Sequence, residues 1–299
     1  MIQLKKTSEN KWIKKYHIKD VFLNTKLEKK TNLFLQKQPY LDYKKIKEIS
    51  KINYNRKFPL GYVLIHNANI VGFLGTLFSK RKVNNKNYIY CTIHTWVVDK
   101  NNRIASHLLF KKLIKKKCVI KVLSPLPNLD SNFTRMGFRI LKMKYRIVFL
   151  KKILYYSNEN NIKIEKNLLK WKKNLNSNDW KICQDHHNPR FLKFIIYDDR
   201  KKTNFSLIVS NIIRKKKYFN VLNILYSSNP KLIKNNWNFI KRIIAKNYRV
   251  SFCGQYFLNE IDCCLPNKVA SSININKKIC VKNLPSKNKF DTIYSEIIY

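Results

Sequence analysis

The segment from Thr92 to Ile114 constrains the fold of this 299-residue chain more than any other part of the sequence. An apolar run is followed by a short polar turn with Arg103, and then by a helical pattern in which Leu109 and Leu113 lie one turn apart. A strand, a turn and a helix in this order bring unpaired backbone N–H groups and the positive end of a helix dipole to one point. The segment therefore predicts a site for a phosphate group.

Further strands and helices are predicted on both sides of this segment. Two helices come first, at residues 18–29 and 40–52, where apolar residues recur at helical spacing. Then follow strands at 60–65, 70–79 and 88–98, a helix at 105–116, a strand at 118–123, a short helix at 131–136 that ends at Gly137, and a strand at 138–149. Asn67-Ala68-Asn69 is typical of a turn, so the first two strands form a β-hairpin.

The second half of the chain repeats this order. A polar stretch at 157–161 indicates a boundary. Beyond it the sequence predicts a helix at 164–175, strands at 191–197 and 205–209 joined across Asp198-Asp199, a strand at 221–226, a helix at 231–246, a strand at 248–253 and a closing strand at 291–299. Hairpin, strand, helix and strand thus occur twice, offset by roughly 130 residues. This pattern predicts a duplication into domains 1–155 and 156–299, although any α/β chain alternates in a similar way.

Positive charge is the strongest bias in the composition. Lys and Arg number 62 against 17 Asp and Glu, which gives a formal net charge of +45. Such an excess attracts polyanions, among them nucleic acid, anionic lipid and a phosphate-rich coenzyme. Asn, Lys and Ile are abundant throughout, however, as expected of a genome rich in A and T, and bidentate recognition of phosphate favours Arg over the Lys that dominates here. Either a polyanionic partner or genomic composition explains the charge.

Cysteines and apolar stretches limit the class of protein. The seven cysteines form no C-x-x-C pair, and with six histidines they give no zinc spacing, which fits reduced thiols and no bound metal. The first residues contain no apolar signal core. Residues 59–79 lack charged side chains, but the polar residues in their middle favour a hairpin over a membrane span. We therefore expect a cytoplasmic protein without membrane contact.

Three motifs in the first half resemble the GNAT family of acyltransferases. Val98-Asp99-Lys100-Asn101-Asn102-Arg103 supplies the valine and arginine of that family's coenzyme loop, and Ile104-Ala105-Ser106-His107-Leu108 follows where the family opens its helix. Phe133-Thr134-Arg135-Met136-Gly137-Phe138 is similar to the family's closing motif, and Gly72-Phe73-Leu74-Gly75 matches its third strand. The resemblance covers residues 15–150. The second half resembles the degenerate repeat of two-lobed GNAT proteins, including Tyr294-Ser295-Glu296.

The resemblance implies an α/β fold, with a mixed, mainly antiparallel central sheet and flanking helices, and an acyl-CoA site in the first domain. In this family the pantetheine arm pairs with the backbone of the fourth strand, so Val97 and Val98 would take that role. The diphosphate would bind the loop and the start of the helix, at Arg103, Ile104, Ala105, Ser106, His107 and Leu108. Glycine normally lets the backbone approach phosphate here, whereas this chain has Ser106 and Leu108 at the small-residue positions. The 3′-phosphate could meet nearby lysines, Lys100, Lys111 and Lys112.

Acyl transfer to an amine needs a base, donors for the oxyanion and an acid for the leaving thiolate. His94 is the candidate base because the pKa of histidine lies near neutrality, and a purely structural histidine is the alternative. The family often places a tyrosine that acts as general acid before the Gly-Phe pair. Phe133 stands at that position here, so no general acid is predicted for the leaving thiolate. Asp185-His186-His187 is interpreted as a turn, and Cys263-Cys264 as inert thiols.

The predicted function is transfer of an acyl group, acetyl by the family's pattern, from acyl-CoA to a small-molecule or peptide amine. The second domain is expected to be a degenerate copy without a coenzyme. The alternative is a GNAT-like protein without turnover that binds nucleic acid or another polyanion through its basic surface. The sequence does not identify the acceptor amine.

Overall fold

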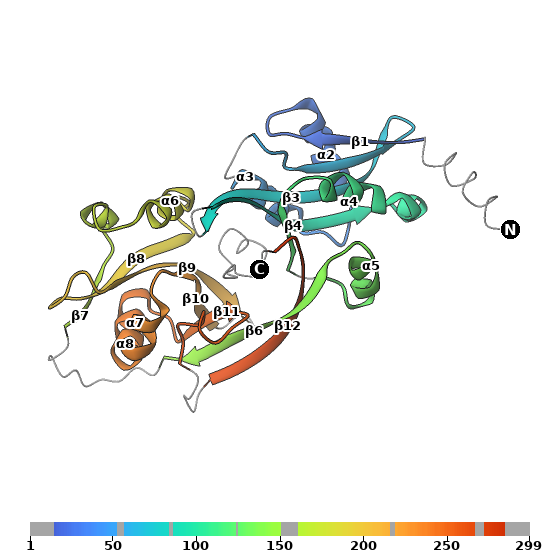
Figure 1. Ribbon diagram of the computed structural model, residues 1–299. Helices are drawn as coiled ribbons and strands as arrows, with labels where there is room; N and C mark the ends of the chain where they lie inside the picture. The colour runs from blue at the N-terminus through green and yellow to red at the C-terminus, as the bar shows by residue number, and fades with distance from the viewer. Residues whose placement is uncertain are drawn as a thin grey trace. The chain divides into compact units, whose positions relative to one another are not determined.

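The protein consists of two compact units, coloured from blue to red along the chain in Figure 1. The structure, a computed structural model, describes residues 15–52, 57–83, 86–123, 125–150, 161–215, 219–266 and 272–284. Unit 1 comprises the described residues up to Ile140 together with 280–284, and unit 2 comprises those from Leu141 to Ile279. These units differ from the predicted continuous domains 1–155 and 156–299, because the last residues of the final strand belong to unit 1. The predicted boundary at 157–161 falls mostly, and the predicted strand at 291–299 entirely, outside the described residues.

Unit 1 is built on a mainly antiparallel sheet. Its strands are β1 (Tyr16–Val21), β2 (Gly61–His66), β3 (Asn69–Val83), β4 (Lys86–Val98) and β5 (Val119–Val122). They stand in chain order, and Cys280 to Lys282, the end of β12 (Ser272–Lys282), pair antiparallel with β5. Neighbouring strands from β1 to β4 are antiparallel, whereas β4 and β5 are parallel. The predicted mixed, mainly antiparallel sheet is therefore confirmed.

Helices cover both faces of this sheet. One layer contains α2 (Lys26–Gln36) and α3 (Tyr43–Lys51), and the other contains η1 (Lys100–Ala105), α4 (His107–Ile114), η2 (Pro127–Leu129) and α5 (Asp130–Arg135). Val63 of β2 packs in the cluster of Phe34 and Ile46, while its neighbour Leu64 packs in the cluster of Leu109. Successive strand residues point to opposite faces, so each layer receives alternate side chains. Burial on both faces explains why β2 reads as a continuous apolar run.

Unit 2 has the same topology. Its strands are β7 (Ile162–Glu165), β8 (Phe191–Asp198), β9 (Phe205–Lys215), β10 (Phe219–Ser227), β11 (Phe252–Phe257) and β6 (Arg139–Phe149), adjacent in that order, with β12 beside β6. As in unit 1, the fourth and fifth strands, β10 and β11, are parallel, and the sixth is antiparallel to the fifth. The last residue of the fourth strand that pairs with the fifth strand is Ile93 in unit 1 and Ile224 in unit 2. These residues are 131 positions apart, which agrees with the offset of the predicted duplication.

The helices of unit 2 also occur at places along the chain that match those of unit 1: two helical segments come between the first two strands, and helices connect the fourth strand to the fifth. They are η3 (Leu168–Trp171), α6 (Ser177–Asp185), α7 (Pro230–Asn235) and α8 (Trp237–Tyr248). Trp237, Ile240 and Ile244 of α8 are buried against the sheet, at the spacing of three and four residues that an amphipathic helix requires. The helix predicted at 231–246 is thus divided in two at Asn236, whose side-chain amide donates to the carbonyl of Leu232.

Three predicted elements are wrong. Residues 16–21 form a strand paired with β2, and the first helix begins only at Lys26, since Thr25 caps it and Asn24 turns the chain at φ 63°. The helix predicted at 164–175 is instead β7 followed by η3, capped by the Asn167 side chain. The strand predicted at 248–253 runs from Phe252 to Phe257, because the helix before it continues to Tyr248.

Turn chemistry was predicted more successfully. Asn67 and Ala68 have φ values of 48° and 63°, as a two-residue hairpin turn requires. Gly137 has φ 78° and follows α5, the position where glycine ends a helix without strain. These residues support the predicted hairpin at 60–79 and the end of the short helix. None of the helices in the described ranges has the length and apolar character needed to cross a membrane.

Candidate functional site

The parallel strands β4 and β5 separate in the middle of unit 1. They pair from Tyr90 with Val119 to Ile93 with Val122, where β5 ends. β4 continues to Val98 and stays paired with β3 along its other edge. Within the described chain, residues 94–98 therefore have a strand partner on one side only, and the other edge can pair with an extended ligand.

A β-bulge lies at the point of separation. Thr76 of β3 pairs with Ile93 and Gly75 pairs with Thr95, so His94 is the extra residue on β4. A bulge bends the strand and redirects the side chain at that position. The candidate base His94 is thus placed where β4 turns away from β5.

A cavity of about 140 Å³ opens at the same place. Four consecutive residues of β4, from Ile93 to Trp96, form one wall. The remaining lining residues come from α4, β5, the segment that leads into α5 and α5 itself, and they are Phe110, Val122, Pro125, Leu126, Leu129 and Phe133. All of them belong to unit 1. The candidate base and Phe133, the first residue of the predicted closing motif, therefore meet around one cavity.

His94 is held in a neutral form by its surroundings. Removal of water from the ring lowers the pKa of His94 to about 4. Its Nδ1 lies 2.9 Å from Oγ1 of Thr95, which leaves Nε2 as the nitrogen that is available to a ligand. At neutral pH the imidazole is uncharged and can accept a proton, but it binds that proton weakly.

The absence of a side chain at Gly75 makes room for the His94 ring. A Cβ at position 75 would lie 2.4 Å from Cε1 and 2.8 Å from Nε2 of His94. Gly75→Ala is therefore expected to cost about 1–3 kcal/mol of stability by overpacking. In a His94→Ala background the same substitution should cost less than about 1 kcal/mol, because the clash is gone. Denaturant unfolding of the four proteins measures this coupling, and an equal cost in both backgrounds would contradict the contact.

The depressed pKa of His94 predicts a pH dependence of stability. The unfolded histidine titrates near its ordinary value of 6.5 and the folded one at about 4, so the unfolded chain binds more protons between these values. The wild-type protein should lose up to about 3 kcal/mol relative to His94→Asn as the pH falls from 6.5 to 4. Above pH 6.5 the difference should be constant. Unfolding free energies of both proteins at five pH values test this, and parallel curves across pH 4–7 would disprove it.

The predicted coenzyme loop follows directly after β4. Residues 100–105 are wound into η1, where a polar turn was expected, and α4 begins at His107. Arg103 is exposed, and Ile104 is 82% exposed. Ser106 has already used its backbone N–H in a bond to the carbonyl of Arg103. An exposed guanidinium thus directly precedes the start of α4, and Ser106 has its hydroxyl, but not its backbone N–H, left for a ligand.

Ala105 and Leu108 belong to the core of unit 1. Leu108 is 6% exposed and packs in the same cluster as Leu109 and Phe110. Its side chain therefore does not occupy the surface of the loop, where a leucine would obstruct the approach of a phosphate. Only the backbone of Leu108 is left to contact a coenzyme.

Two hydrogen bonds tie the loop to the helix layer and to β1. The Gln38 amide donates to Oδ1 of Asp99, and the Tyr16 hydroxyl donates to Oδ1 of Asn102. Lys112 forms an ion pair with Asp20. Of the three lysines suggested for the 3′-phosphate, Lys100 and Lys111 remain exposed, whereas Lys112 is already engaged.

The wall formed by α4 and α5 is aromatic and carries no acid. Phe133 is buried and lies edge-on to Trp96, Phe110 and Phe138, at centroid distances of 6.3, 5.8 and 5.3 Å. A phenyl ring cannot donate a proton, so this position supplies none to a leaving group. The Trp96 indole N–H is buried without a hydrogen-bond partner among the described residues. The sequence did not single out Trp96, and it gave Gly75 only as part of a strand motif, because the contacts of both depend on the register of the sheet.

The other candidate residues have structural surroundings. His186 is fully buried at the end of α6, with Nδ1 2.8 Å from the carbonyl of Ile182 and its ring against Phe191. Burial raises the pKa of the Cys263 thiol to about 11 and that of Cys264 well above its usual value. In the described ranges, no three His, Cys, Asp or Glu side chains gather in a way that could hold a metal ion.

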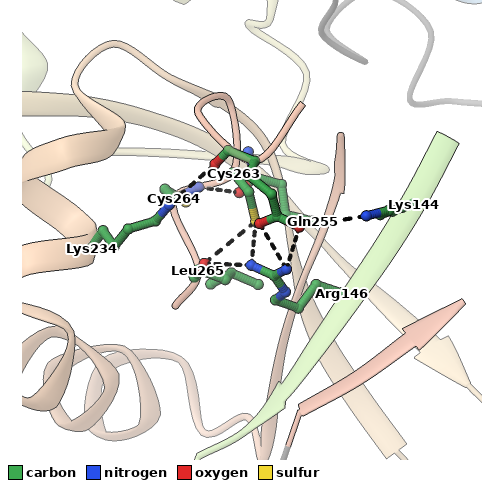
Figure 2. Close-up of polar contacts among 8 residues, drawn as sticks. Lys144, Arg146, Lys234, Gln255, Cys263, Cys264 and Leu265 are labelled. Atoms are coloured by element: carbon green, nitrogen blue, oxygen red, sulfur yellow. Dashed lines mark hydrogen bonds and ion pairs between the residues drawn. The ribbon is translucent and has the colours of Figure 1, made fainter. Parts of the chain in front are cut away.

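In unit 2, the place that corresponds to the cavity of unit 1 is occupied by residues of unit 2 itself. A bulge lies between Ile224 and Tyr226 of β10, and Gln255 of β11 occupies the last paired position. The Gln255 side chain accepts from the N–H of Cys264 (Figure 2). It also donates to the carbonyl of Asp262. Residues 263–265, which follow β11 as the cavity-lining residues follow β5, are fully buried.

A buried arginine binds the segment that follows β11 in unit 2. Arg146 of β6 is 0% exposed and donates to both carboxylate oxygens of Glu260 at 2.9 Å. It also donates to the carbonyl of Leu265 at 3.0 Å, and its guanidinium lies over the ring of Phe257 (Figure 2 shows the arginine between β6 and this segment). The segment after β11 is thus part of the core of unit 2.

Comparison with solved structures identifies the fold. A GCN5-related N-acetyltransferase from Anabaena variabilis matches with a TM-score of 0.57 and 11% identity, over 89% of this chain and 72% of that one. A GCN5-related N-acetyltransferase from Kribbella flavida matches with a TM-score of 0.56 and 8% identity, over 89% and 70%. At such low identity the likeness concerns the fold alone, and this chain has the GNAT fold. No family model matches the sequence, and no curated protein matches it.

Proposed function

We propose that this protein is an acyl-CoA-dependent N-acyltransferase whose coenzyme binds in unit 1 and whose acceptor is an amine. One observation carries the proposal. The cavity at the bulge of β4, the free edge of β4 beyond the bulge and the exposed Arg103 before α4 follow one another along a single stretch of chain. This order suits a ligand with a thioester at one end, amides in the middle and a diphosphate at the other.

In this proposal each part of the coenzyme meets a different part of that stretch. The diphosphate binds Arg103 and the start of α4, where charge-assisted hydrogen bonds and the helix dipole favour an anion. The pantetheine amides pair with the backbone of β4 at Val97 and Val98. The thioester reaches the cavity, where the unpartnered indole N–H of Trp96 is a donor within the same wall.

The chemistry is attack of the amine nitrogen on the thioester carbonyl. A C–N bond forms, the C–S bond breaks, and the thiol leaves with a proton. Because the pKa of His94 is lowered to about 4, this side chain cannot remove the proton of an ammonium ion efficiently at pH 7. We infer that the amine attacks in its neutral form and that Nε2 of His94 receives the proton lost on C–N bond formation.

Release of free thiol from acyl-CoA tests the proposal. The assay combines acetyl-CoA, the acyl donor expected from the family resemblance, and butanoyl-CoA with small amines and lysine-containing peptides. Amine-dependent thiol release that rises with the fraction of neutral amine is expected, and it should be lost in Arg103→Ala. A folded protein that releases no thiol with any amine, with either donor, would contradict the enzymatic proposal.

The alternative of a binding protein without turnover rests on the charge of +45 and on Phe133, which lacks the proton of a tyrosine. It predicts affinity for nucleic acid that falls steeply with salt. The cavity at the bulge favours the enzyme, because recognition of a polyanion by surface charge needs no such cavity.

A further inference from the structure

The cavity beside His94 is larger than an acetyl group needs. Its volume of about 140 Å³ is close to that of engineered cavities of about 150 Å³ that take up benzene, a molecule of six carbon atoms. An acetyl group would bring a single methyl carbon beyond the thioester carbonyl. Most of the cavity would then stay empty or hold water against apolar walls, and both outcomes are unfavourable.

The lining of the cavity is apolar and has a buried end. Leu126 is 62% exposed and lies at the entrance, whereas Phe110 and Phe133 are at most 1% exposed and lie at the inner end. Of the polar side chains in the wall on β4, His94 and Thr95 are bonded to each other, and the indole N–H of Trp96 has no partner among the described residues. Alkyl carbons are therefore the ligand atoms that this inner space accommodates best.

We infer that the acyl group transferred by this protein is longer than acetyl, with about four carbons in all, and that its alkyl part fills the space in front of Phe133. This inference rests on the proposed function. The thioester carbonyl and sulfur take part of the volume near β4, and the remainder suits three or so further carbons, by comparison with benzene in a cavity of similar size.

Phe133 determines the length of the chain. Its ring is fixed by edge-on contacts with Phe110 and Phe138, so it cannot move aside without breaking an aromatic cluster. Phe138 belongs to the same cluster but does not line the cavity. Phe133→Leu therefore changes the cavity, and Phe138→Leu is a matched control that changes only the core.

The test is calorimetric titration of the full chain with CoASH and with acetyl-, butanoyl-, hexanoyl- and octanoyl-CoA. Each methylene buried in the cavity is expected to tighten binding about fourfold, so butanoyl-CoA, with two more methylenes, should bind about fifteenfold more tightly than acetyl-CoA. Affinity should fall again for octanoyl-CoA. In Phe133→Leu the best chain should become longer by about two carbons, whereas Phe138→Leu should keep the wild-type order.

Two failures are distinguishable. If CoASH and acetyl-CoA bind but butanoyl-CoA binds no more tightly than acetyl-CoA, the chain-length inference is wrong and the proposed function stands. An unchanged order of affinities in Phe133→Leu likewise overturns it. If no coenzyme binds to the folded wild-type protein, the proposed function fails and the inference falls with it.

Discussion

Replacement of Arg103 by Ala is expected to weaken binding of CoASH about ten- to a hundredfold. Arg103 is the exposed guanidinium that immediately precedes the helix start after β4. A hydrogen bond to a charged group contributes about 1.5–3 kcal/mol, and each 1.4 kcal/mol changes affinity tenfold. The loss should shrink at high salt, since screening weakens the same interaction in the wild-type protein.

Two variants control for this effect. Arg103→Lys keeps the charge but loses the planar fork, so it should retain affinity between those of the wild type and Arg103→Ala. Arg200→Ala removes an exposed arginine from the turn between β8 and β9 of unit 2 and should leave binding unchanged. Calorimetric titration with CoASH measures all four proteins. Equal weakening by Arg103→Ala and Arg200→Ala would mean that general charge, and not this loop, holds the coenzyme.

Replacement of Arg146 by Met is expected to destabilise unit 2 by about 1.5–3 kcal/mol. Arg146 is fully buried, and its guanidinium bonds both oxygens of Glu260 and the carbonyl of Leu265. Without it, the buried carbonyl of Leu265 loses the guanidinium donor and the segment after β11 loses this attachment to β6. The carboxylate of Glu260 can turn to water, because 41% of its side chain is accessible, so the cost comes from the lost charge-assisted hydrogen bonds and from the buried carbonyl.

Lys144→Met is the matched control on the same strand. Lys144 lies 3.8 Å from Glu260 but is about half exposed, with 48% of its side chain accessible, so its loss should cost less than about 1 kcal/mol. Urea unfolding followed by tryptophan fluorescence measures both variants. The folded fraction of Arg146→Met should still bind CoASH, because the proposed site lies wholly in unit 1. Similar costs for the two substitutions would show that the arginine is not the attachment of this segment.

The sequence was sufficient to predict strands and turns that depend on local chemistry. The hairpin at 60–79, the strand before Arg103 and the end of α5 at Gly137 follow from apolar runs and from residues that tolerate positive φ. β1 was mistaken for the start of a helix because Ile18 and Val21 fit helical spacing, and pairing with β2 overrode that pattern. β12 was missed since it is rich in Asn and Lys and is specified mainly by its pairing partners.

The sequence suggested residues for the candidate site but not their geometry. Arg103 was singled out by the motif and His94 by the pKa of histidine, whereas the bulge at His94, the room left by Gly75 and the cavity in front of Phe133 depend on strand register. Leu108 stands where the family has a small residue, and a leucine pointing out of the loop would obstruct a coenzyme. The sequence does not say which way a side chain points at the first turn of a helix. In the structure Leu108 is buried in the core, which removes that objection.

Amide hydrogen exchange of the full chain with and without saturating CoASH tests most directly whether the coenzyme binds along β4. The account predicts slower exchange for residues 94–98, whose far edge gains hydrogen bonds, and for the start of α4 after Arg103, with no protection at the equivalent end of β10 in unit 2. Saturation with CoASH that leaves exchange at 94–98 unchanged would contradict it.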